Sequence, residues 1–161
     1  MTASARGRTD RAERLVKATP ERIYAAFVDG AALMAWLPPR GMTGRVLELK
    51  AREGGRYRIE LSYADNARES SGKTTGRTDV SSGRFVEMLP GRRIKQSVEF
   101  ESSDAAFAGE MMMTWSFDAV PDGTLVTVTA ENVPRGISKQ DHDAGMQSSL
   151  ENLARFVERP T

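Results

Sequence analysis

Residues 138–158 read SKQDHDAGMQSSLENLARFVE. Apolar side chains recur on one face of this stretch at three- and four-residue spacing, at Met146, Leu150, Leu153 and Val157, which is the pattern of an amphipathic helix. Ser138 precedes the apolar pattern and is a candidate N-cap. Asp141 lies three positions after Ser138, which is close to a capping box. We therefore expect one long helix from Ser138 to about Glu158, with an apolar stripe that another element must cover.

The chain before this helix is dominated by alternating apolar and polar residues. In residues 56–63, for example, Tyr57, Ile59, Leu61 and Tyr63 alternate with charged residues and a serine, which is typical of a half-buried antiparallel strand. Similar alternation marks 94–101 and 111–117, and we expect further strands at 11–17, 46–49, 83–89 and 125–130. The polar segment 64–82 predicts a long hairpin loop, with the alternative that its distal part joins the next strand, and 102–109 predicts a shorter loop.

Two short helices are expected between the first strand and the second. Thr19-Pro20-Glu21 has the composition of a helix start: an N-cap, a proline at the first helical position and a carboxylate in the first turn. Asp29-Gly30 should end this helix, and a second should cover residues 31–37 until Pro38-Pro39 stops it. Hairpin-linked strands with helices gathered at both ends of the chain indicate the α+β class.

This order of elements predicts a curved antiparallel sheet of about seven strands wrapped around the long C-terminal helix. The helix is the only expected element whose apolar stripe matches the apolar face of the sheet, and the curvature should leave a cavity between them. We expect residues 11–161 to form a single domain and residues 1–10 to be a disordered tail.

Composition narrows the classes of function. The 161 residues are 39% hydrophobic and 28% charged, with a net charge of +1, so no strong field favours nucleic acid or an anionic membrane as a partner. With one histidine, no cysteine and no clustered acids, we expect no metal site, and no cofactor motif is present. A polar N-terminus and the lack of cysteine are consistent with a cytoplasmic protein.

Six stretches, in this order along the chain, resemble the START-like (SRPBCC) helix-grip superfamily: residues 18–27 (ATPERIYAAF), 35–39 (AWLPP), 83–91 (GRFVEMLPG), 107–111 (FAGEM), 123–128 (GTLVTV) and 145–154 (GMQSSLENLA). The resemblance is to the branch similar to the heat-shock-protein-90 ATPase activator homologue family. It implies a helix-grip fold, whereas it specifies function poorly, because the superfamily includes carriers, receptors and enzymes.

A small apolar or aromatic ligand, held between the sheet and the last helix, is therefore the leading hypothesis for function. Methionine adapts to varied apolar partners, and Trp36 before the two prolines could close a mouth of the cavity, although both residue types also fill ordinary cores. The residues we expect to contact the ligand are Trp36, Tyr57, Ile59, Phe85, Val98, Phe100, Met113, Trp115, His142, Met146 and Leu150.

Two other classes of function stay open. His142, the only histidine, lies on the apolar face of the last helix, where it could serve as the acid or base of a cofactor-free cyclase, dehydratase or hydrolase. The resemblance also implies, as a third possibility, an interaction module that stimulates a chaperone ATPase. Homodimerisation through an exposed sheet edge is a further alternative that no residue pattern indicates.

Overall fold

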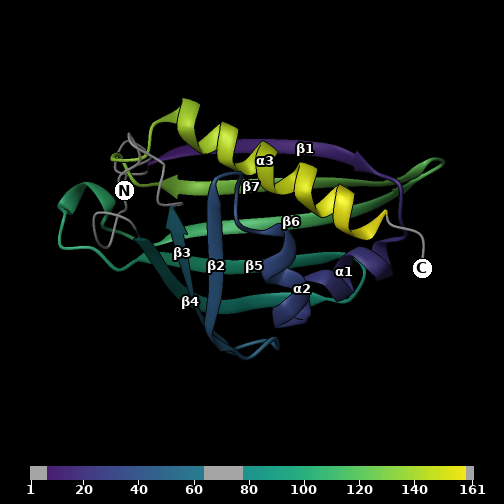
Figure 1. Ribbon diagram of the computed structural model, residues 1–161, viewed down its shortest axis with the longest axis horizontal. Coiled ribbons are helices and arrows are strands. Elements are labelled where there is room, and N and C mark those ends of the chain that lie inside the picture. The colour runs from purple at the N-terminus through teal and green to yellow at the C-terminus, as the bar shows by residue number, and fades with distance from the viewer. Residues whose placement is uncertain (1–6, 64–77, 159–161) are drawn as a thin grey trace, which may run out of the picture.

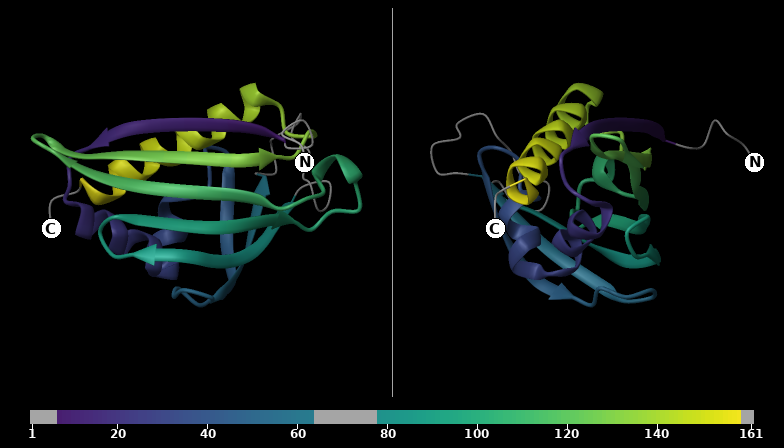
Figure 2. Two further views of the ribbon diagram at one scale, coloured as in Figure 1. Left: turned by 180° about the vertical axis from the view of Figure 1, so that it is seen from behind. Right: turned by 90° about the vertical axis from the view of Figure 1, so that its right-hand side faces the viewer.

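The computed structural model describes residues 7–63 and 78–158. It contains one sheet of seven strands, with the three α-helices gathered on one of its faces (Figures 1 and 2). The strands are β1 (Arg8–Val16), β2 (Met42–Leu49), β3 (Arg56–Tyr63), β4 (Thr78–Leu89), β5 (Arg93–Phe100), β6 (Met111–Val120) and β7 (Gly123–Val133). The helices are α1 (Pro20–Val28), α2 (Gly30–Trp36) and α3 (Lys139–Val157), and the short 3-10 helix η2 covers Ala105–Phe107. The predicted α+β helix-grip class is confirmed.

The sheet has the order β1-β7-β6-β5-β4-β3-β2, and every neighbouring pair is antiparallel. Strands β2 to β7 each pair with the next strand along the chain, and β1 pairs with β7 at the edge of the sheet opposite β2. The register shifts within β1, β2 and β4, the last between Phe85 and Glu87. Such bulges increase local twist, and they allow the sheet to curve around α3.

Helices α1 and α2 carry the chain from β1 at one edge of the sheet to β2 at the other. Thr19 caps α1 by accepting a hydrogen bond from the backbone N–H of Arg22, and Pro20 occupies the first helical position, as predicted. Asp29 ends α1 and at the same time caps α2, because its carboxylate accepts from the N–H of Ala32 at 2.9 Å. One aspartate thus fixes the corner between the two helices.

Helix α3 lies across the concave face of the sheet and buries the predicted stripe. Ser138 is its N-cap and accepts from the N–H of Asp141 at 3.1 Å. Leu150 and Leu153 are fully buried, and Ala154 and Val157 are nearly so. These residues belong to a continuous apolar core with the inner faces of the strands and with α1 and α2.

Several element boundaries differ from the sequence predictions: β2 begins at Met42 and β7 covers Gly123–Val133, so both are longer than predicted. Strand β1 begins at Arg8 instead of residue 11, because Asp10 and Ala12 pair with β7 and are buried; residues 8–10 are therefore part of the sheet, and residues 1–6 of the predicted tail lie outside the described residues. Strand β4 begins at Thr78, so the last part of the predicted 64–82 loop is strand, and 64–77 is not described. The short helix η2, in a segment expected to be loop, is capped by Asp104.

Candidate functional site

A cavity of about 950 Å³ lies between the concave face of the sheet and α3. Its walls come from α1, α2, strands β2 to β6, the η2 segment and the cavity-facing side of α3. Apolar side chains of β3, β4, β5 and β6 point into it because successive residues of a strand face opposite sides of the sheet. The covering helix and the curvature of the sheet together create this space.

The structure brings nearly all of the predicted ligand-binding residues to this cavity. Leu150 is the exception: it is fully buried in the apolar core and does not line the cavity. The predicted residues that line the cavity are Trp36, Tyr57, Ile59, Phe85, Val98, Phe100, Met113, Trp115, His142 and Met146.

Aromatic rings form one wall of the cavity. Trp36 and Trp115 meet edge to face with ring centroids 5.6 Å apart, and Phe27 packs against both, at 4.6 Å and 5.0 Å. The indole N–H of Trp36 donates to the backbone carbonyl of Ala26 at 2.9 Å. Such edge-to-face contacts hold rings in defined orientations, so this wall is preformed.

A second aromatic pair lies on the sheet. The rings of Tyr57 and Phe85 are 5.4 Å apart, and the phenol of Tyr57 donates to the backbone carbonyl of Ser97. Burial raises the pKa of Tyr57 above its ordinary value, so this hydroxyl stays protonated and remains a structural donor. It leaves the neighbouring cavity surface largely apolar.

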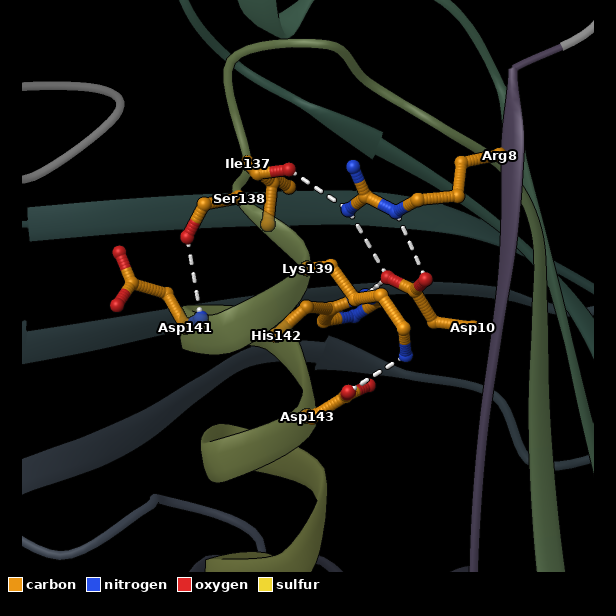
Figure 3. A network of polar contacts seen from close by, with 8 residues as sticks. All are labelled: Arg8, Asp10, Ile137, Ser138, Lys139, Asp141, His142 and Asp143. Atoms are coloured by element: carbon orange, nitrogen blue, oxygen red, sulfur yellow. Dashed lines mark hydrogen bonds and ion pairs between the residues drawn. The ribbon is translucent and has the colours of Figure 1, made fainter.

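At the polar end of the cavity, where His142 is a lining residue, the start of β1 meets the first turn of α3 in a network of polar contacts (Figure 3). Nδ1 of His142 lies 2.8 Å from Oδ2 of Asp10. The Arg8 guanidinium binds both oxygens of the Asp10 carboxylate, at 2.7 Å and 2.9 Å, and also donates to the carbonyl of Ile137 at 2.7 Å. The Asp10 side chain is inaccessible to water, whereas 14% of the His142 side chain is exposed.

The charge state of Asp10 determines the tautomer of His142. Burial alone would raise the pKa of Asp10, but hydrogen bonds from Arg8 and His142 outweigh burial and lower it. An ionised carboxylate can only accept hydrogen bonds, so we assign the proton to Nδ1 of His142, which donates to Asp10. In the neutral imidazole Nε2 then carries the lone pair, and within residues 7–63 and 78–158 it makes no hydrogen bond.

The remaining charged groups around the cavity are mostly acidic. Among the described residues, Asp79, Asp104 and Asp141 line it, against Arg40 as the one guanidinium or ammonium group. Burial raises the pKa of Tyr63, and the nearby charges of Asp79 and Asp141 raise it further.

Gly145 provides open space beside His142. It lies three residues further along α3, on the same face of the helix, and it lines the cavity. A Cβ added there would meet no heavy atom of the described residues within 4 Å. Glycine in a helix interior is unfavourable relative to alanine, and protein packing around this residue does not require it.

Sequence reasoning identified His142 but missed its partners. Arg8 and Asp10 fall in a stretch expected to be a disordered tail, and no local pattern distinguishes an aspartate that will be buried 132 residues from its partner. Gly145 did have a signal, since a glycine inside a helical pattern often has a packing or functional reason.

Neither a cluster of metal-ligating side chains nor a membrane-spanning helix is found among the described residues. No group of three or more histidine, aspartate or glutamate side chains lies close enough there to hold a metal ion. No described helix is both long enough and apolar enough to span a bilayer.

Comparison with known proteins places this chain in a family. Residues 17–158 match the family described as activator of Hsp90 ATPase homolog 1-like proteins. The chain belongs to the AHSA1-like family. A structure from Chromobacterium violaceum is 35% identical, with a TM-score of 0.83, and the match covers 94% of this chain and 98% of that one. No curated protein matches the chain.

More distant structures share the AHSA1-like fold. An AHSA1-like protein from Aeromonas hydrophila is 18% identical, with a TM-score of 0.70, over 94% of this chain and 92% of its own. A protein from Rhodobacter sphaeroides is 22% identical, with a TM-score of 0.71, over 94% and 95%. The predicted resemblance is thus confirmed at the level of family and fold.

Proposed function

We propose that this AHSA1-like protein binds a small, largely apolar molecule in the cavity between the sheet and α3. The observation that carries the proposal is the cavity itself, with a volume of about 950 Å³. Binding sites for small molecules are typically of 300–1,000 Å³, mostly apolar, and equipped with a few polar groups that orient the ligand. The aromatic wall supplies the apolar surface and His142 supplies a polar group.

The construction of the walls supports binding without large rearrangement. The rings of Phe27, Trp36 and Trp115 are fixed by mutual contacts, so little conformational entropy is lost when a ligand packs on them. Met113 and Met146 add flexible, polarisable surface, which adapts to the shape of different apolar ligands.

Native mass spectrometry of freshly purified protein, followed by denaturing extraction, tests the proposal directly. We expect a retained or added apolar molecule at one copy per chain. Trp36 and Trp115 are the two tryptophans of the chain and both line the cavity, so binding should also change tryptophan emission saturably. An apo mass, together with unchanged emission across a panel of apolar aromatic compounds, would contradict the proposal.

A cofactor-free acid–base enzyme is the second candidate, and the His142–Asp10 contact is the observation that favours it. A carboxylate that holds Nδ1–H leaves Nε2 ready to take a proton from a bound substrate. In that case Asp10→Asn and His142→Gln should both abolish turnover while the ligand still binds. Turnover that survives both substitutions would exclude this role for His142.

A further inference from the structure

We infer that the His142 end of the cavity is a subsite for an uncharged hydroxyl on an otherwise apolar ligand, with Nε2 of His142 accepting a hydrogen bond from the hydroxyl and Gly145 leaving room for the head group. The inference rests on the proposed function and specifies the ligand class: a molecule with a hydrocarbon body and one alcoholic or phenolic O–H.

The first step in the argument is the direction of the imidazole. The two ring nitrogens are separated by one carbon and their bonds point to opposite sides of the ring. Because Nδ1 is directed at Asp10 on β1, Nε2 points away from β1, and His142 is a lining residue of the cavity. With the Nδ1–H tautomer, Nε2 is an acceptor. The complementary ligand group is therefore a donor.

The second step concerns charge. Arg8 binds Asp10 through two hydrogen bonds, so the positive charge that would favour an anionic ligand is already paired. Within the described ranges, Asp104 and Asp141 line the cavity, and Arg40 is the one guanidinium or ammonium group among the lining residues. A carboxylate ligand would meet like charges there and lose its hydration, whereas a neutral O–H would not.

The third step concerns space. A head group bound at Nε2 must fit against the first turns of α3. Gly145 has no side chain and leaves the helix backbone uncovered there. Gly145 lines the cavity, and a Cβ added there would meet no heavy atom of the described residues within 4 Å. Glycine therefore gives the ligand access next to His142 at a cost in helix stability.

Three rigid probes with the same aromatic body test the subsite: naphthalene, 2-naphthol and 2-naphthoate. We expect 2-naphthol to bind roughly tenfold more tightly than naphthalene, the effect of one buried hydrogen bond, and 2-naphthoate to bind less tightly than 2-naphthol. His142→Phe keeps a ring at this position but removes the acceptor. In this variant the preference for 2-naphthol over naphthalene should disappear while the affinity for naphthalene changes little.

Histidine NMR provides a readout that requires no substitution. The chain has one histidine, so tag-free protein labelled with ¹⁵N-histidine gives signals from a single imidazole. We expect a protonated Nδ1 and an unprotonated Nε2 in the free protein. On addition of 2-naphthol the Nε2 resonance should shift by several ppm, and naphthalene should leave it nearly unchanged.

The outcomes separate the subsite from the proposed function. If naphthalene and 2-naphthol bind with equal affinity and the Nε2 resonance does not move, the subsite is refuted while apolar binding stands. If 2-naphthoate binds most tightly, the charge argument is wrong and the subsite binds anions. If none of the three probes binds, the proposed function fails and the subsite fails with it.

Discussion

The imidazole of His142, in the first turn of α3, donates from Nδ1 to the buried carboxylate of Asp10 near the start of β1, 2.8 Å away. A second contact joins the opposite ends of the same two elements, since the backbone N–H of Lys17 donates to the carboxylate of Glu158 at 2.8 Å. The edge strand and the covering helix are thus joined at both ends. The polar end of the cavity is therefore part of what holds the helix on the sheet.

Asp10→Asn should destabilise the protein in a way that depends on pH. At pH 7 we expect a loss of about 1–3 kcal/mol in the free energy of unfolding, because a buried charge-assisted hydrogen bond is weakened. The pKa of Asp10 is lower in the folded protein than its ordinary value of 3.8. Its ionisation therefore stabilises the fold fully above that value, and this contribution is lost as the pH falls through the lowered pKa.

Urea denaturation of the two proteins between pH 7 and pH 2.5 measures this dependence. The difference in free energy of unfolding should be largest above about pH 4 and should shrink below it. Glu101→Gln is a suitable control, because Glu101 pairs with Arg58 on the exposed face of the sheet, where water screens such pairs and they contribute little to stability. A difference for Asp10→Asn that is constant down to pH 2.5 would contradict the assignment.

Gly145→Ala should make the protein more stable. The new methyl group meets open space in the described structure, and alanine is favoured over glycine in a helix interior by about 0.5–1 kcal/mol. The exposed neighbour Ala144 offers the matched reverse change, since Ala144→Gly should cost a similar amount without altering the cavity. Chemical denaturation measures both, and a loss of stability in Gly145→Ala would show that the space beside residue 145 is filled.

Ser149→Ala should loosen the attachment of α2 to α3. The hydroxyl of Ser149 donates to the carbonyl of Leu37 at 2.6 Å in a buried position, so its removal leaves that carbonyl without this partner and should cost about 1–2 kcal/mol. The adjacent Ser148 accepts from the N–H of Arg40 at an exposed position, and Ser148→Ala should cost less. Equal losses in thermal or urea unfolding would contradict the distinction.

Met113→Trp and Met112→Trp compare the two faces of β6. Met113 lines the cavity and Met112 does not, because neighbouring strand residues face opposite sides of the sheet. A larger side chain at residue 113 should lower the affinity for an apolar probe such as naphthalene at least fivefold, while the same change at residue 112 should leave it within twofold. These magnitudes correspond to roughly 1 kcal/mol and 0.4 kcal/mol. Titration calorimetry decides between them, and equal affinities would place the ligand elsewhere.

Local patterns were enough to predict most of the fold. Alternation identified β3, β5 and β6 because a strand with one wet face must alternate, and Thr19 and Ser138 marked helix starts because their side chains replace missing backbone acceptors. The boundary of β1 was missed because Arg8 and Asp10 are polar. They join the sheet through pairing with β7 and through contacts with α3, which no window of neighbouring residues contains.

For the candidate site, too, local sequence patterns predicted some features and only the tertiary structure decided others. The sequence by itself determined which side chains face inward, and these include ten of the eleven predicted contacts, because strand and helix periodicity is a property of the local chain. Only the tertiary structure decided that Leu150 packs in the core, that Asp10 orients His142, and that Gly145 opens onto the cavity. Each of these depends on how far the sheet curves around α3 and on which distant segment reaches it, and such long-range geometry is set by the packing of the whole domain.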